Sequence, residues 1–245
     1  MRAGAQTRVD RLLANLGYGS RTEVRTLLTA GWVTLDDVAV GDGALKVRLD
    51  RDLCERMRVA DEPLDPPAPL SLIVHKPLGV VCSHKDFGRS VYELLPQRWR
   101  RRSPALSSIG RLDLDTTGLL ILTDDGALLH SLISPRRRVA KRYRAELERP
   151  LGGDEAVLFA SGEMWLEGET TPLAPALLEP VTRVAVYLTI TEGRYHQVRR
   201  MFAATGNRVT ALHRDRIGAL GLPDDLSPGE WRILDYREQA LLLTA

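Results

Sequence analysis

Apolar positions near the amino terminus recur with a helical period. Four aliphatic residues share one helical face just before a glycine: Val9, Leu12, Leu13 and Leu16. This spacing predicts a short helix that ends at Gly17. Ser20 and Glu23 form a capping-box pattern, which predicts a second helix that begins there and ends at Gly31. Residues 32–37, WVTLDD, then alternate as a strand entering a hairpin turn does.

Beyond residue 70 the pattern predicts separate strands and helices. Apolar runs at 70–77 and 118–123, and the alternating stretch 182–193, are typical of strands. The stretches 127–133 and 196–207 have the spacing of helices. Because strands and helices do not alternate regularly, we predict an α+β fold rather than a doubly wound parallel sheet.

A proline-rich segment divides the chain. Residues 61–70, DEPLDPPAPL, hold four prolines, which exclude a helix or a central strand and favour a stiff extended connector. We therefore expect a domain over 1–62, a linker over 63–70 and a larger domain over 71–245. The composition, 44% hydrophobic and 27% charged, is that of an ordinary globular protein.

The sequence excludes several classes of protein. No apolar run approaches the roughly 18 residues that a membrane span needs, and the first residues lack the apolar core of a signal peptide. Cys54 and Cys82 are too few for a disulfide framework and lack the spacing of a zinc site. We expect a cytoplasmic protein with reduced cysteines and no metal.

The basic residues are almost all arginine: only four of the 34 are lysine. Codon bias in a GC-rich genome would explain the count, but not the clustering at 98–102, 136–144 and 194–216. Planar guanidinium groups suit phosphate contacts, so these clusters favour a nucleic-acid partner over a merely solvated charged face.

Four aspartates lie in the stretch GRLDLDTTGLLILTDDG, residues 110–126. Asp113 precedes a predicted strand, on a loop where a carboxylate can face a cleft, and only one of Asp113 and Asp115 is expected to do so. Asp124 and Asp125 fall at a strand-to-helix junction, where capping and turn geometry explain them without chemistry.

Three reactions compete for Asp113. Residues 113–117 fit the D-x-D-x-T pattern of haloacid-dehalogenase phosphatases, but no buried apolar strand precedes them, and Lys141 is the only lysine that follows. A glycosidase pair would need carboxylates facing each other across a sugar, which residues two apart do not normally do. The third reaction is covalent attack by a single aspartate on a nucleoside.

Four motifs in a fixed order favour the third reaction. They are H-K-P-x-G at 75–79, G-R-L-D-x-D-T-T-G-L at 110–119, K-R-Y at 141–143 and E-G-R-Y-H-Q-V-R-R-M-F at 192–202. In this combination the chain resembles pseudouridine synthases of the RsuA branch, from about Arg8 to the carboxyl terminus. His75 stands where the family more often has asparagine.

The amino-terminal stretch resembles the S4 RNA-binding module. By that resemblance Ser20, Arg21, Arg25 and the strand edge near Thr34 would face RNA. Asp37 occupies a turn position where the family usually has glycine, so either the hairpin is one residue longer or its turn is strained. A small helical cap on the second domain is the alternative.

The resemblance implies a role for each matching residue. Asp113 would be the nucleophile, Tyr143 would contact the target base, Arg199 would pair with the aspartate, and Leu212 would line the base pocket. A guanidinium opposite the carboxylate would keep it charged and oriented. The isomerisation moves the glycosidic bond from N1 to C5 without net redox change, so no cofactor is expected. Whether the aspartate attacks C1′ or C6 stays open.

Further residues are candidates for RNA or substrate binding: Arg111, Thr117, His196 and Gln197. Flipping a stacked uridine costs a few kcal/mol, which phosphate contacts from Arg111 and the 136–144 cluster would offset. His196 and Gln197 could equally bond the backbone of a turn.

The sequence therefore predicts a monomeric rRNA pseudouridine synthase that acts on 16S rRNA, free or within a partly assembled small subunit. A 23S rRNA synthase and a non-catalytic ribosome-assembly protein are the alternatives.

Overall fold

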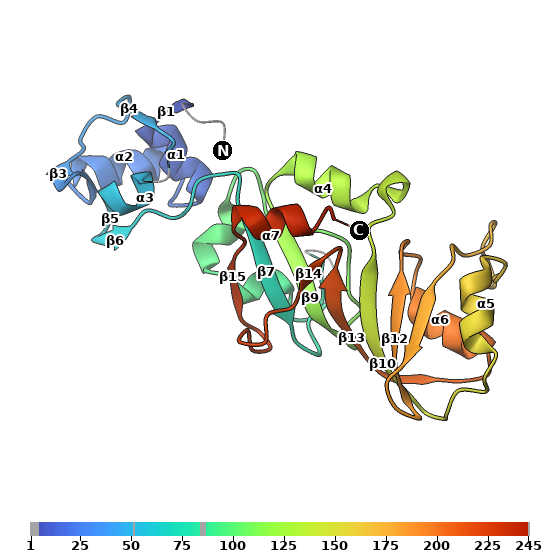
Figure 1. Cartoon of the computed structure of the whole chain (residues 1–245). Coiled ribbons are helices and arrows are strands. Elements are labelled where there is room, and N and C mark those ends of the chain that lie inside the picture. The colour runs from blue at the N-terminus through green and yellow to red at the C-terminus, as the bar shows by residue number, and fades with distance from the viewer. Residues whose placement is uncertain (1–4, 51, 84–86, 245) are drawn as a thin grey trace. The chain divides into compact units, whose positions relative to one another are not determined.

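The computed structural model describes residues 5–50, 52–83 and 87–244, which form two units. The first unit comprises Met1–Ser71, Leu95–Ser107 and Thr123–Asp125. The second comprises Leu72–Leu94, Ser108–Leu122 and Gly126–Ala245. Each unit contains both helices and strands (Figure 1).

Both helices predicted near the amino terminus are present in the first unit. Helix α1 (Val9–Leu16) buries its four aliphatic residues and ends at Gly17, whose φ is 91°. Helix α2 (Arg21–Thr29) begins with the predicted capping box: the Glu23 N–H donates to the Ser20 hydroxyl, and the Ser20 N–H donates to the Glu23 carboxylate. The local signals sufficed because a cap and a left-handed glycine act within one turn.

The remaining elements of the first unit are short. They are β1 (Gln6–Arg8), β2 (Val33–Leu35), β3 (Val38–Ala39), β4 (Lys46–Arg48), α3 (Leu53–Arg56), β5 (Met57–Val59), β6 (Glu62–Pro63) and the 3₁₀ helix η2 (Gln97–Arg101). Strand β1 pairs with β4, and the other four form a sheet in the order β3-β2-β5-β6. Their aliphatic side chains pack against α1 and α2 in one core.

The β2–β3 hairpin keeps a two-residue turn, since Leu35 pairs with Val38. Asp36 and Asp37 both adopt left-handed conformations, with φ of 51° and 63°. The strained turn is therefore the correct alternative, and aspartate is one of the few residues that tolerate it. The Arg56 guanidinium holds Asp36 in place by two hydrogen bonds of 2.8 and 2.7 Å.

The proline-rich segment is neither helix nor strand from residue 64 to residue 70, and it is bound within the first unit. Arg98 donates twice to the Asp65 carboxylate, and Arg102 donates to the Pro66 carbonyl. The Asp124 carboxylate accepts from the Leu70 N–H at 2.6 Å and from Arg102 at 3.2 Å. Asp124 therefore anchors this segment rather than capping the helix that follows it.

The second unit is built on a nine-stranded, mainly antiparallel sheet, which agrees with the predicted α+β class. Its strands are β7 (Ser71–Lys76), β8 (Ser107–Ser108), β9 (Thr116–Thr123), β10 (Lys141–Leu147), β11 (Leu177–Pro180), β12 (Ala185–Ile190), β13 (Val209–Ile217), β14 (Leu220–Gly221) and β15 (Trp231–Ile233). The order is β11-β12-β10-β13-β9-β7-β15; β14 pairs with β13, and β8 pairs with β9. Strands β13 and β9 run parallel.

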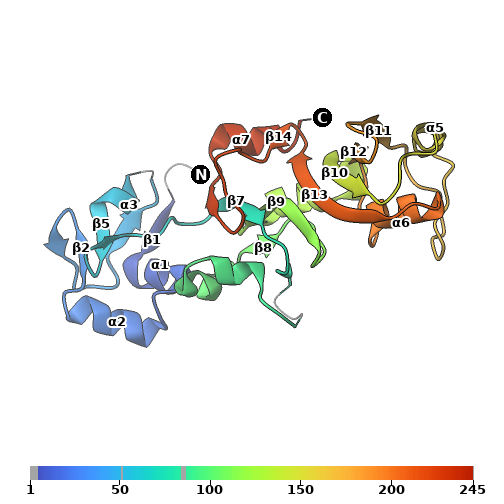
Figure 2. The ribbon, with the colours of Figure 1, turned by 90° about the horizontal axis from the view of Figure 1, so that it is seen from below.

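Helices flank this sheet. They are α4 (Gly126–Ile133), α5 (Glu155–Ser161), α6 (Gln197–Ala204) and α7 (Tyr236–Leu241), with the 3₁₀ helices η1 (Val91–Leu94) and η3 (Pro135–Arg137). Figure 2 shows α7 on one side of β7 and β9. On that side Leu119 and Ile121 of β9 pack with Leu132 and Leu242. No helix in the described ranges is long and apolar enough to cross a membrane.

Alternation along the strands separates two faces of the sheet. Residues of β9 and β13 alternate in direction, so Thr117 and His213 lie on the side of this core, and their side chains are hydrogen-bonded at 2.8 Å. Thr116, Leu212 and Arg214 lie on the opposite side, where they line a cavity.

Candidate active site

A cavity of about 590 Å³ opens on the sheet of the second unit. Its walls come from loop residues 110–114, from β10, from residues 193–198 and from β13. Ile190, Val198 and Leu212 give it an apolar lining, beside several charged side chains. A largely apolar cavity of this size with a few convergent polar groups suits a small ligand or a single nucleoside.

The loop that carries Asp113 is fixed by backbone hydrogen bonds. The Leu112 N–H donates to the Cys82 sulfur at 3.4 Å, and the Thr116 N–H donates to the Asp113 carbonyl at 3.1 Å. Of the two neighbouring aspartates only Asp113 lines the cavity. The Asp115 side chain is 62% exposed and pairs with Arg199 at 2.9 Å.

Tyr143 is positioned by the alternation of β10, which turns Arg142 and Arg144 to the other face of the sheet. It is 8% exposed, and its hydroxyl accepts a hydrogen bond of 3.4 Å from Arg214 Nη1. Leu212, on the adjacent strand β13, completes an apolar patch beside it. The tyrosine ring and the leucine thus flank the space next to Asp113.

Arg214 is the cavity residue that the sequence analysis missed. It is 2% exposed, and its Nε donates to the Leu119 carbonyl at 2.9 Å. Within the described residues its Nη2 has no hydrogen-bond partner. One signal was present: Leu212 and Arg214 are two residues apart, so on any strand they face the same side.

Gly118 lets β9 lie close enough to β13 to place Arg214. The two residues face each other in the parallel pair, and Gly118 has φ of 111°. A Cβ atom at residue 118 would collide with the backbone of Arg214. The T-T-G-L motif therefore reflects a close approach of two backbones.

Gly118→Ala is expected to destabilise the protein by roughly 2–5 kcal/mol, because it combines a disfavoured φ with forced separation of two strands. Chemical denaturation followed by tryptophan fluorescence would measure the loss. Gly126→Ala is the matched control, since a Cβ there meets no atom within 4 Å, and it should change stability little. Equal stability of the two variants would contradict the proposed role of the close approach.

Two lysines add positive charge around the cavity. Lys76 of the H-K-P-x-G motif is fully buried, and its ammonium group donates to the Thr116 and Pro77 carbonyls. Burial lowers the pKa of Lys76, while the nearby Asp113 partly offsets that shift. Burial also lowers the pKa of Lys141, which lines the cavity and donates to the Val139 carbonyl.

The other residues predicted for the site do not all line the cavity. Arg111, His196 and Gln197 line the cavity, and His196 Nε2 lies 3.4 Å from Asp113 Oδ1. Thr117 faces away from it, bonded to His213, and Arg199 is bonded to Asp115 outside the lining.

Three predicted residues belong to the first unit. Ser20 caps α2, and Arg21 and Arg25 are exposed on that helix.

Comparison with known proteins identifies the family and the fold. Residues 71–204 match the model of the RNA pseudouridylate synthase family. The chain belongs to the RNA pseudouridylate synthase family. It is 42% identical over 234 residues to the ribosomal small subunit pseudouridine synthase A of Vibrio cholerae serotype O1, covering 95% of this chain and 98% of that protein. The protein of the same name from Escherichia coli strain K12 is 40% identical over 237 residues, with 95% and 98% covered.

A solved structure agrees with this assignment. A crystal structure of a pseudouridylate synthase superposes with a TM-score of 0.68 at 35% identity, covering 96% of this chain and 99% of that one. The family match spans Asp113, Tyr143 and most other lining residues of the cavity, whereas Leu212 and Arg214 lie beyond its end at residue 204. The resemblance to pseudouridine synthases found in the sequence is thereby confirmed.

Proposed function

We propose that this RNA pseudouridylate synthase converts one uridine of small-subunit ribosomal RNA to pseudouridine, as a cytoplasmic monomer without a cofactor. The substrate is proposed from the relatives named ribosomal small subunit pseudouridine synthase A, which match nearly the full chain. The reaction is proposed from one observation: the Asp113 carboxylate lines a cavity that a tyrosine and a buried guanidinium group also line.

Asp113 acts as the nucleophile on a uridine flipped into the cavity. The N1–C1′ bond breaks, the uracil rotates, the C5–C1′ bond forms, and the C5 proton is lost while N1 gains one. Tyr143 stacks on the base and helps to move the C5 proton, and Leu212 packs against its edge. Arg111, His196 and Gln197 would contact the substrate around this base, supported by their place in the lining.

We propose Arg214, rather than Arg199, as the guanidinium group that pairs with Asp113. Arg214 is buried and lines the cavity, whereas Arg199, which the family resemblance suggested, is bonded to Asp115. Nη2 of Arg214, which has no hydrogen-bond partner among the described residues, is available to the carboxylate or to a uracil oxygen. Arg199 would then position the loop through Asp115.

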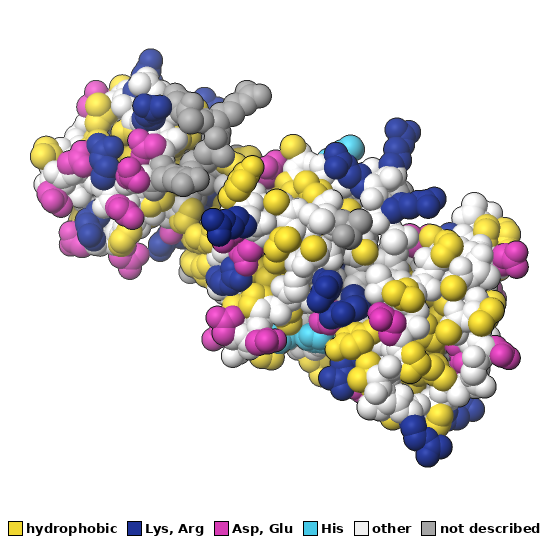
Figure 3. All heavy atoms as spheres, viewed as in Figure 1, with side chains coloured by type: hydrophobic (Ala, Val, Ile, Leu, Met, Phe, Trp, Pro, Cys, Tyr) yellow, Lys and Arg dark blue, Asp and Glu magenta, His cyan; other side chains and the backbone are white. Residues whose placement is uncertain are grey.

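The first unit is proposed to be an S4-like RNA-binding module over residues 1–62, followed by a connector over 63–70. Arg21 and Arg25 are exposed one turn apart on α2, where both can reach phosphates. Within the second unit, Arg136, Arg137 and Arg138 are exposed in and just after η3, and Lys and Arg side chains project from the surface in this region (Figure 3). These arginines would bind the RNA backbone around the target.

Mapping of pseudouridines in rRNA from cells with and without the gene tests this function. We expect one site in small-subunit rRNA to lose its pseudouridine on deletion and to regain it when the wild-type gene is restored. Loss of a large-subunit site instead would support the 23S alternative. An unchanged pseudouridine map would contradict the enzymatic function and favour a non-catalytic assembly protein. Repeating the assay with purified protein on free rRNA and on isolated subunits would identify the form of the substrate.

A further inference from the structure

Two aromatic rings form a stack at the edge of the cavity. Tyr195 and His196 both line it, and their rings lie 3.8 Å apart at 19°, close to parallel. His196 Nε2 is also the group 3.4 Å from the Asp113 carboxylate. Tyr195, in contrast, is 76% exposed. The stack thus begins beside the proposed nucleophile and ends in solvent.

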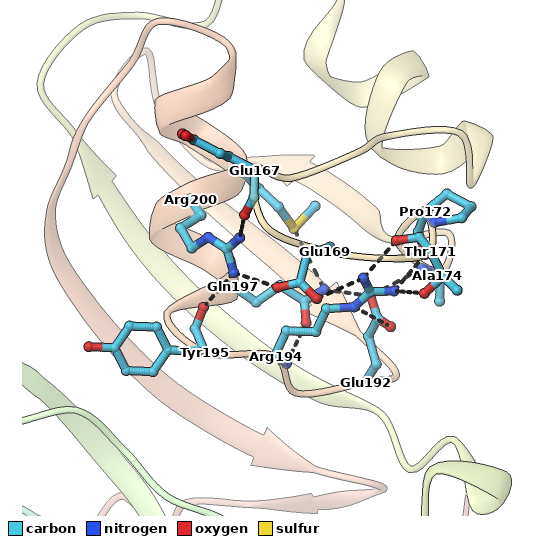
Figure 4. Close-up of polar contacts among 11 residues, drawn as sticks. Glu167, Glu169, Thr171, Pro172, Ala174, Glu192, Arg194, Tyr195, Gln197 and Arg200 are labelled. Atoms are coloured by element: carbon cyan, nitrogen blue, oxygen red, sulfur yellow. Dashed lines mark hydrogen bonds and ion pairs between the residues drawn. The ribbon is translucent and has the colours of Figure 1, made fainter.

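The loop that carries this stack is clamped by charged side chains (Figure 4). Glu169 accepts from Arg194 at 3.1 Å and from Arg200 at 2.7 Å. Hydrogen bonds from Arg200, and then from Arg194, hold the pKa of Glu169 below its usual range. Arg194 also donates to the Thr171 carbonyl at 2.8 Å, which ties the loop to the segment before β11.

The backbone on each side of Tyr195 is fixed as well. The Tyr195 carbonyl accepts from Arg200, and the Arg194 N–H donates to the Gln197 amide oxygen at 2.9 Å. Gln197 donates in turn to Glu192 at 2.9 Å. The Tyr195 ring points away from this cluster in Figure 4. Its position is therefore set by the loop before any substrate arrives.

This arrangement differs from an incidental surface tyrosine. An exposed aromatic ring by itself needs no explanation. Here, however, the inner face of the ring is covered by His196, the backbone on both sides is hydrogen-bonded, and the whole loop borders the cavity. A fixed aromatic plane at the spacing of stacked rings suits a nucleobase, and such stacking accepts any base because each has a π-face.

We propose that Tyr195, supported by His196, is the platform on which a base next to the target uridine stacks, which makes Tyr195 a substrate-positioning residue of the reaction. The inference rests on the proposed RNA substrate. With the target uridine in the cavity, its neighbour in the chain remains outside, at the solvent end of the stack. The platform replaces the stacking that this neighbour loses when the uridine leaves the helix.

Tyr195→Ala tests the platform, with an rRNA fragment that contains the mapped uridine as substrate. We expect KM to rise roughly 5- to 100-fold, the range that corresponds to loss of one base–aromatic stack, while the single-turnover rate at saturating RNA changes by less than about 3-fold. Tyr195→Phe should behave as wild type because the ring is kept. Tyr236→Ala, which removes a tyrosine that is 82% exposed on α7, is the matched control and should change neither quantity.

A second substrate identifies the stacked base. Two further fragments each carry one abasic site, on one side of the target uridine or on the other. With one of these two fragments, wild type and Tyr195→Ala should have the same KM. An unchanged KM in Tyr195→Ala, an equal defect in Tyr195→Phe, or a difference that survives both abasic substitutions would overturn the proposal. A wild-type enzyme that forms no pseudouridine in rRNA would instead refute the proposed function, and this inference with it.

Discussion

Asp113→Asn is expected to lose pseudouridine formation by more than about 10⁴-fold, a loss typical for removal of a covalent nucleophile. The amide keeps the size and hydrogen-bonding shape of the side chain but cannot form the ester-like bond to the nucleoside. Because Asp113 lies on a loop fixed by the Leu112 and Thr116 N–H groups, the fold should be retained. RNA affinity should change by less than about 3-fold, since most affinity comes from phosphate contacts made elsewhere.

The neighbouring aspartate provides the control. Asp115→Asn makes the same chemical change two residues away, on a side chain that is 62% exposed and lies outside the cavity. Its activity should stay within about 10-fold of wild type, because it loses only an exposed ion pair. Single-turnover conversion, measured by mass spectrometry of the digested RNA, would compare the variants. Full activity in Asp113→Asn, and also in Asp113→Ala, would contradict the nucleophilic role.

Local patterns predicted the first unit well because its elements depend on neighbouring residues. Two of these signals depend only on a few neighbouring residues: the capping box of Ser20 and Glu23, and the helix end at Gly17. Both are present in the structure. The Asp36–Asp37 turn was left open by the sequence, because its geometry depends on pairing between Leu35 and Val38 and on Arg56. The length of a hairpin turn follows from the pairing of its two strands, and the sequence alone does not give that pairing.

The arginine clusters show the limit of arguments from composition. Arg98 and Arg102 of the 98–102 cluster hold the proline-rich segment, and the Arg102–Asp124 pair is almost fully buried. Arg194 and Arg200 bind Glu169 of the same unit. These guanidinium groups are bonded to carboxylates and carbonyls of the protein itself. The number of arginines in a sequence cluster therefore overestimates the positive charge that RNA can reach. Which arginines remain exposed depends on the position of acidic residues far away in the chain.

The cavity itself was only partly predictable. Asp113 and Tyr143 were found through motifs, and alternation along β10 explains why Tyr143 faces the cavity. Thr117 and Arg199 belong to the same motifs but face elsewhere, because a motif match does not show which way a side chain points. Arg214 reaches the cavity through the pairing of β13 with β9 at Gly118, a contact between distant parts of the sequence. Such a pairing leaves only a weak local signal.

The charge balance of the cavity favours Arg214 over Arg199 as the guanidinium group that pairs with Asp113. Arg214 is buried, and within the described residues it forms no ion pair with a carboxylate; it donates hydrogen bonds to a carbonyl and to a tyrosine hydroxyl. A buried cation without a counter-charge is costly unless a ligand or a nearby anion compensates it. Asp113 lines the same cavity and is a candidate for that anion. Arg199 already has its counter-charge in Asp115.

Arg214→Ala is therefore expected to lower the single-turnover rate by about 10²–10³-fold, the loss typical when a preorganised donor to reacting groups is removed. Arg214→Lys keeps the charge without the planar fork and should retain more activity than the alanine variant. Arg199→Gln should lose less than about 10-fold, because its partner is exposed. Thermal unfolding would show whether each variant is folded, and added methylguanidinium should restore part of the activity of Arg214→Ala alone. If Arg199→Gln were the more damaging change, and methylguanidinium rescued an Arg199→Ala enzyme instead, Arg199 would be the partner of Asp113, since a residue that only maintains the fold cannot be replaced by a free cation.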